Sequence, residues 1–235
     1  TPSAASGMTT PSEAMTTARS ATKLRHAWRK ASAIGFVAGA PANNWTRLMA
    51  ATLDVILAAA KDSATFLPPP ALALLNGAAI ASCDAMDGLK DGLIDDPRNC
   101  RFDPASIECS AGRQPPDCLT NAQVAAARRI YSGPRDPQSG QQIYPGLEPG
   151  SERAWIAAIN PASPFPIPLS HYRWVAFRDS TWDWRTFDWS RPADANVARD
   201  VDGRVAAILN ATNPDLDAFR TRGGKLIQYH GWADM

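Results

Sequence analysis

The residues with the clearest chemical potential form an acidic loop in the first half of the chain. The loop contains four regularly spaced aspartates, Asp84, Asp87, Asp91 and Asp95. Gly88 follows the second of them and Gly92 the third. Calcium binds six to eight oxygens of carboxylates and carbonyls at about 2.3–2.6 Å, and glycine lets a backbone turn its carbonyls inward. The three- and four-residue spacing differs from that of an EF-hand loop. The pattern therefore predicts a calcium site of another kind.

The alternative for this loop is a solvated acidic turn, in which the aspartates cap neighbouring N–H groups. Charge favours the metal, because several carboxylates between residues 84 and 96 repel one another. Only Lys90 and Arg98 are near enough in sequence to offset them. No arrangement of histidine or cysteine in this region suits a transition metal.

Four cysteines surround and follow the acidic loop: Cys83, Cys100, Cys109 and Cys118. They allow three pairings, and we expect Cys83–Cys100 and Cys109–Cys118, which close short loops. A zinc site is the less favoured alternative, since there is no C-x-x-C and no nearby histidine. Disulfides form in oxidising compartments, which predicts a secreted or periplasmic protein. A Cys83–Cys100 bridge would also hold both ends of the acidic loop.

The bulk composition fits a folded domain and favours neither nucleic acid nor membrane as a partner. The chain has 235 residues, of which 45% are hydrophobic and 20% charged, and its formal net charge is +1. A balanced charge gives no electrostatic attraction to nucleic acid or to an anionic bilayer. Its apolar runs are shorter than the roughly 18 residues of a membrane span. Residues 1–20 are polar and lack the apolar region of a signal peptide.

Two strands and several helices are expected to position these residues. Short apolar segments at 31–40 and 225–229 read as strands, and helices are expected at 45–61, 71–81, 120–131, 195–209 and 213–222. Thr120 and Gln123 form a capping-box pattern, and prolines 68–70 are expected to interrupt regular structure. The long middle between the strands predicts an insertion in a larger sheet. An independent α+β domain is the weaker alternative, because two strands make a poor sheet.

Six longer segments together resemble the tannase and feruloyl esterase family. They are FVAGAPANNW, CDAMDGLKDGLIDDPRNCRFDP, CLTNAQVAAARRIYSGPRD, IYPGLEPGSE, WDWRTFD and GGKLIQYHGWAD. They cover the chain from about residue 36 to its end, and such long matches are not expected by chance. The resemblance implies an α/β fold, with a partial α/β-hydrolase core and a large inserted, disulfide-bonded, mixed α+β lid. Core pieces would lie at 34–50 and 216–235 and the lid at 51–215, with residues 1–33 unmatched.

The resemblance also implies a serine carboxylic-ester hydrolase that acts on small aromatic esters of the feruloyl or galloyl type. Such enzymes use a catalytic triad, in which a serine attacks the ester carbonyl, a histidine moves the proton and an aspartate orients the histidine. Asp234 lies in HGWAD, after the second strand, where the family places its triad acid; without the resemblance it reads as an ordinary loop carboxylate. The family's structural calcium would be held by side chains of Asp84, Asp87 and Asp91 and by backbone carbonyls of Leu89 and Leu93.

The rest of the triad cannot be assigned. The sequence contains no G-x-S-x-G nucleophile elbow, and His26, His171 and His230 do not stand at the family's position for the base. We therefore expect an incomplete internal fragment that is inactive alone. The alternatives are a non-catalytic, calcium-stabilised module that binds aromatic ligands, and a degraded gene product.

The second half of the chain is rich in tryptophan. Trp174, Trp182, Trp184 and Trp189 lie within sixteen residues of one another. Large aromatic side chains usually serve in packing, which is what we expect of most of them. The functional alternative is a flat apolar wall for the aromatic acid of the substrate.

Overall fold

The computed structural model describes residues 35–234. These residues form two compact units, one made of 35–39 and 213–229 and the other of 40–212 and 230–234. The expected unmatched segment, His26 and the first residues of the expected strand at 31–40 lie outside the described residues. The two units are described separately below.

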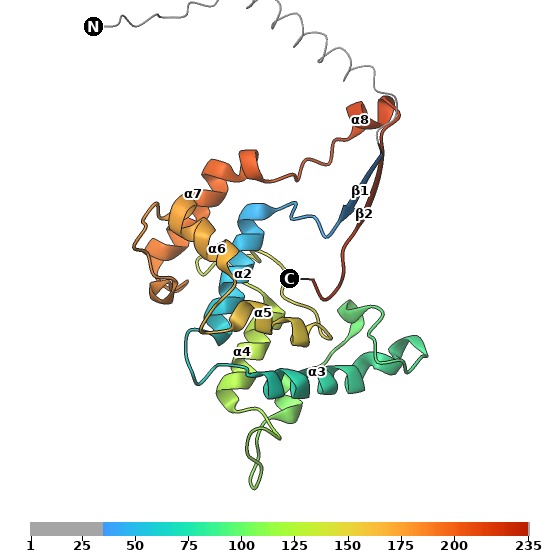
Figure 1. Ribbon diagram of the computed structural model, residues 1–235, viewed down its shortest axis with the longest axis vertical. Coiled ribbons are helices and arrows are strands. Elements are labelled where there is room, and N and C mark those ends of the chain that lie inside the picture. The colour runs from blue at the N-terminus through green and yellow to red at the C-terminus, as the bar shows by residue number, and fades with distance from the viewer. Residues whose placement is uncertain (1–34, 235) are drawn as a thin grey trace, which may run out of the picture. The chain divides into compact units, whose positions relative to one another are not determined.

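The first unit is a pair of parallel strands with one short helix. Strand β1 (Gly35–Gly39) pairs with β2 (Lys225–Tyr229), so that Gly35 lies opposite Lys225 and Gly39 opposite Tyr229 (Figure 1). Both strands were predicted. Helix α8 (Asp217–Thr221) is shorter than the expected 213–222, because the side chain of Asn213 caps the N–H of Asp215 in a turn.

The second unit is helical. Its longer helices are α2 (Trp45–Ala59), α3 (Pro69–Cys83), α4 (Asn121–Ser132) and α7 (Pro192–Leu209). Short helices α5 (Ile156–Ile159) and α6 (Pro166–His171) lie between α4 and α7, and a π-helical turn (Tyr172–Ala176) continues α6. β structure in the described residues 40–212 is limited to two isolated bridges, Glu108 with Leu119 and Arg135 with Gln142. The mixed α+β character expected for this region is therefore confined to single residue pairs.

Helix α2 is the centre of the helical unit, in contact with α4, α5, α6 and α7. Its apolar residues recur at helical spacing, but the helix is buried nearly all round rather than on one face. Leu53 and Ile56 are completely buried, and Leu75 of α3 and Trp155 join them in one continuous core. The core therefore forms between helices that are distant in sequence.

The prediction that prolines 68–70 interrupt regular structure was wrong in part. Pro69 and Pro70 form the first turn of α3. The first N–H groups of a helix have no intrahelical partner, so proline loses nothing there and its fixed φ suits the helix. By contrast, the capping box at Thr120 is confirmed. The Thr120 hydroxyl accepts a hydrogen bond from Gln123 N at 3.2 Å, and Gln123 Oε1 accepts one from Thr120 N at 3.0 Å.

No helix among residues 35–234 combines the length and the apolar character that crossing a membrane requires.

Candidate functional site

The acidic loop follows α3 and is shaped by two glycines with left-handed backbone. A single 3₁₀ turn (Asp84–Asp87) ends at Gly88, whose φ is 95°, and Gly92 has a φ of 84°. Both disulfides that we expected are present: Cys83–Cys100 joins the two ends of the loop, and Cys109–Cys118 closes the next one. The chain is thus turned back on itself within residues 83–100.

The carboxylates of this loop accept hydrogen bonds from its own backbone. Asp84 is nearly buried, and its Oδ1 accepts from the N–H groups of Asp91 (3.2 Å) and Gly92 (3.1 Å). Oδ1 of Asp87 accepts from Leu89 N at 2.8 Å, and Oδ1 of Asp91 accepts from Leu93 N at 3.1 Å. Among the described residues, the Oδ2 atoms of these three aspartates accept no hydrogen bond and form no ion pair.

The loop offers oxygen ligands, but the structure does not gather them at one point. No three carboxylate, histidine or cysteine groups within residues 35–234 are close enough together to hold a metal. The hollow beside the loop, of about 560 Å³, is instead lined by Asp87, Asp91 and the exposed Leu89 and Leu93, among others. The donor set suits calcium, since it consists of hard carboxylate and carbonyl oxygens that have lone pairs available for a metal.

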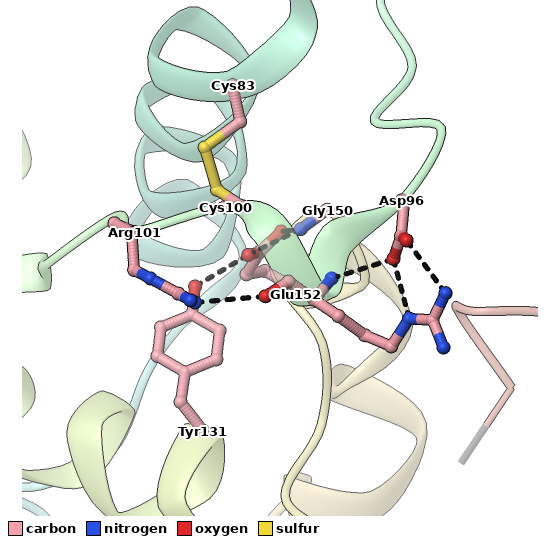
Figure 2. Close-up of a disulfide and its surroundings, with 8 residues drawn as sticks. Cys83, Asp96, Cys100, Arg101, Tyr131, Gly150 and Glu152 are labelled. Atoms are coloured by element: carbon pink, nitrogen blue, oxygen red, sulfur yellow. Dashed lines mark hydrogen bonds and ion pairs between the residues drawn. A yellow bond between two sulfur atoms is a disulfide. The ribbon is translucent and has the colours of Figure 1, made fainter. Parts of the chain in front are cut away.

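A buried carboxylate lies behind the disulfide at the base of this loop. Glu152 has no exposed surface, and its carboxylate accepts from Tyr131 Oη at 2.6 Å, Asn76 Nδ2 at 2.8 Å and Gly150 N at 2.9 Å. Figure 2 shows the Tyr131 hydroxyl and the Gly150 N–H directed at Glu152 beside Cys83–Cys100. Burial, and secondarily the charge of Glu152, raise the pKa of Tyr131, so its proton stays on the hydroxyl.

This polar network connects the acidic loop with the helical core. Asn76 receives a further hydrogen bond on Oδ1 from Arg153 Nε at 2.9 Å. Asn76, Gly150 and Arg153 line the same hollow as Asp87 and Asp91. Sequence reasoning missed Glu152, because an isolated glutamate after PGS carries no local sign of burial.

Asp234 lies in a turn after β2 and lines a cavity of about 180 Å³. Its backbone N–H donates to Gly231 O at 3.1 Å, and its side chain is exposed. His230 shares this cavity, whose walls are largely apolar and include Leu48, Val55 and Tyr144. The buried Asp54 also lines this cavity. Its carboxylate forms an ion pair with the guanidinium of Arg129, with Oδ1 and Nη2 2.5 Å apart.

The two described histidines have different surroundings. His171 is buried, its Nδ1 accepts from Trp45 Nε1 at 3.3 Å, and burial lowers its pKa. A neutral ring that accepts a hydrogen bond in the core serves packing. His230 is exposed at the end of β2.

The tryptophan-rich segment is mostly core. Trp182 is 7% and Trp184 4% exposed, whereas Trp174, on the π-helical turn, is 58% exposed. Trp182 stacks on Phe177 with ring centroids 5.0 Å apart, and Phe187 meets Trp189 edge-on at 4.9 Å. The packing role that we expected of most of these tryptophans is therefore what the structure shows for Trp182 and Trp184.

Comparison with known proteins gives one consistent result. Residues 31–235 match the family model described as tannase and feruloyl esterase. An uncharacterized esterase of Xanthomonas campestris is 34% identical over 216 residues, which cover 85% of this chain and 37% of that protein. A probable feruloyl esterase B-2 of Aspergillus terreus is 32% identical over 202 residues, which cover 86% of this chain and 37% of the relative.

Solved structures agree with the sequence comparison. Feruloyl esterase B from Aspergillus oryzae superimposes with a TM-score of 0.74 at 32% identity, over 85% of this chain and 39% of that structure. A tannin acyl hydrolase from Aspergillus niger gives a TM-score of 0.68 at 24% identity, which shows a shared fold. The chain thus spans between a third and two fifths of the length of these relatives.

Proposed function

Because the chain belongs to the tannase and feruloyl esterase family, we propose that it forms part of a serine carboxylic-ester hydrolase. The observation that carries this proposal is the match over residues 31–235, together with relatives named as feruloyl esterases. We propose small aromatic esters of the feruloyl or galloyl type as substrates. The mechanism would be acyl transfer to a serine and then to water.

Asp234 is our assignment for the triad acid. It follows a parallel strand, which is where α/β-hydrolases carry such residues, and it shares a largely apolar cavity with His230. In this assignment residues 34–50 and 216–235 belong to an α/β-hydrolase core, and residues 51–215 form its lid. We assign no nucleophile and no base, because the sequence has no G-x-S-x-G motif and neither described histidine fits the role.

Trp174 is our candidate for an apolar wall against the aromatic acid. More than half of its surface is exposed to solvent, whereas Trp182 and Trp184 are buried in the core. A flat exposed ring is suited to stacking on an aromatic ligand.

A segment exchange tests the esterase proposal. Residues 36–234 would replace the matching segment of feruloyl esterase B from Aspergillus oryzae, and hydrolysis of methyl ferulate would be measured. We expect activity in the chimera and a loss of about 10⁴-fold with Asp234→Asn, because a triad acid orients its histidine. Asp217→Asn on exposed α8 is the matched control and should leave the rate unchanged. The chain by itself should show no turnover.

Two outcomes would contradict this proposal. One is a chimera with native circular dichroism that does not cleave methyl ferulate. The other is an Asp234→Asn chimera that is as active as its parent.

We also propose that the acidic loop binds one structural calcium. The side chains of Asp84, Asp87 and Asp91 and the carbonyls of Leu89 and Leu93 would hold it. The support is an all-oxygen donor set, carboxylates without cationic partners among the described residues, left-handed glycines and a disulfide that closes the loop. Binding would draw together carboxylates that are now engaged one by one with backbone N–H groups.

Metal removal tests the calcium proposal. We expect one calcium per chain by elemental analysis. At a hundredfold excess over Kd the ion stabilises the fold by about 2.7 kcal/mol, so chelation should lower Tm by roughly 5–10 °C. Asp87→Asn with Asp91→Asn should remove both effects, whereas Asp117→Asn, an exposed control, should not. The same melting curve with and without chelator, and no bound calcium, would exclude the site.

The two disulfides support a proposal that the protein acts outside the reducing cytosol. Disulfides persist in secreted and periplasmic proteins and are rare in the cytosol.

A further inference from the structure

A third cavity lies in the helical unit, away from Asp234 and the acidic loop. It has a volume of about 250 Å³ and shares no residue with the cavity at Asp234 or with the hollow at the acidic loop. The beginning of α2, the turn at 136–143 and the middle of α7 form its walls. Pockets for small molecules begin at roughly 300 Å³, so this cavity suits a ligand the size of one small ring.

Two arginine–aspartate pairs line this cavity, and in each pair the arginine neutralises the charge of its aspartate. Arg47 donates to Asp202 Oδ2 from Nε at 3.2 Å and from Nη2 at 3.1 Å. Arg199 Nε donates to Asp136 Oδ2 at 2.6 Å. This ion pair holds the pKa of Asp136 well below its usual range, so the carboxylate stays charged. The four charged groups sum to zero.

A tryptophan in the same wall carries an unpartnered donor. Trp189 lines the cavity, and its Nε1–H is buried with no acceptor among the described residues. A buried N–H without an acceptor is uncommon in folded proteins, but this one has almost no accessible surface, so a ligand in the cavity would contact the ring and not its N–H. The ring also offers an apolar face, beside Ile143 and the alanines of α7.

The wall chemistry is poorly suited to three ligand classes. An anion would face two carboxylates beside the two arginines, and a cation would face two arginines beside the two carboxylates, so neither gains from a site whose charges sum to zero. An apolar ligand would remove water from the ion pairs and from the side chains of Ser139 and Gln141 and give no hydrogen bond in return. A neutral ligand with several hydroxyl groups satisfies all of them, because each hydroxyl both donates and accepts.

We propose that this cavity binds a single sugar ring. The outer lone pairs of Asp136 and Asp202 would accept from ring hydroxyls, the free N–H groups of the two arginines would donate, and Trp189 would contact the C–H face. The site is independent of the proposed ester hydrolysis and would persist if that proposal failed.

Indole N–H resonances give a direct test on the intact chain. D-glucose, D-galactose, D-xylose and L-arabinose would be titrated separately into ¹⁵N-labelled protein, with the Trp189 signal assigned from Trp189→Phe. We expect a saturable shift of that signal with at least one sugar, at a Kd on the order of millimolar. Arg199→Ala should weaken binding about tenfold or more.

Two further variants keep the test decisive. Ala198→Leu adds bulk to the cavity wall and keeps all four charged residues, and it should also abolish the shift, which covers the case that Arg199→Ala does not fold. Arg204→Ala is the matched control, because Arg204 lies on the same helix and pairs with Asp200 outside the cavity. A spectrum unmoved by all four sugars would overturn the proposal. So would a shift that persists in Ala198→Leu, or a saturable shift with inorganic phosphate instead.

Discussion

At the scale of single residues, the chain contains carboxylates of two kinds. Those of the acidic loop are near water or the loop's own backbone and are recognisable by their spacing. Glu152 is completely buried and is stabilised by a tyrosine, an asparagine and a backbone N–H. A buried carboxylate is tolerated only when its lone pairs are satisfied.

Replacement of Glu152 by alanine should therefore strongly destabilise the helical unit. The substitution leaves the hydroxyl of Tyr131 and the N–H of Gly150 without acceptors, at about 1–3 kcal/mol for each unsatisfied group, and leaves the amide of Asn76 with Gly150 O alone. We expect the free energy of unfolding in urea to fall by about 3 kcal/mol or more. Glu108→Ala is the control, since Glu108 accepts only from exposed Asn121 among the described residues, and should change it by less than about 1 kcal/mol. Equal effects of the two would show that the Glu152 network contributes nothing.

At the scale of elements, α2 begins with a cap supplied from the other end of the helical unit. Asn44 precedes the helix but makes no capping hydrogen bond to it. Instead, Asn210, which follows α7, accepts from Thr46 N at 3.0 Å and donates to Thr46 Oγ1 at 2.9 Å. Ala211 N donates to Asn43 O at 2.7 Å beside it. The end of α7 is thereby fastened to the start of α2.

Asn210→Ala should separate these two helix ends. Loss of a helix cap costs about 1–2 kcal/mol, and we expect a corresponding drop in the free energy of unfolding. Hydrogen exchange at the amides of Thr46 and Ala211 should become faster in the same variant. Asn160→Ala removes only a local turn bond to Ala162 and serves as the comparison. Unchanged exchange at Thr46 in Asn210→Ala would refute the cap.

At the scale of the whole molecule, the two units differ in how well they bury their apolar residues. The helical unit has a continuous core. The strand pair exposes apolar side chains, with Val37 at 70% and Ile227 at 63% exposure. These two residues are register partners in parallel strands. A two-stranded sheet with exposed faces and edges is a site for association.

The chain should therefore self-associate through its strand pair. We expect sedimentation velocity to show species larger than a monomer, in proportions that rise with concentration. Val37→Lys with Ile227→Lys should shift the distribution toward monomer, because lysine on strands opposes pairing. Ile208→Lys, at a residue that is 80% exposed on α7, should leave the distribution unchanged. A parent chain that stays monomeric at every concentration would contradict this expectation.

Local patterns in the sequence were sufficient for features that depend on neighbouring residues. The acidic loop, the capping box at Thr120, both disulfides and the two strands arise from residues close in sequence, or from closing short loops. The longer motifs were sufficient to identify the family, because they combine many residues in one order. Short-range geometry and side-chain chemistry determine such features before any long-range packing forms.

Only the tertiary structure decided the features that join distant segments. Glu152 meets Asn76 across 76 residues, and Asn210 caps Thr46 across 164. Neither pair follows any helical or strand period, because burial and partnership depend on which elements pack together. The same reason explains why the sequence could not separate the buried Trp182 and Trp184 from the exposed Trp174. All three have the same chemistry, and only their positions relative to α2 and its neighbours distinguish them.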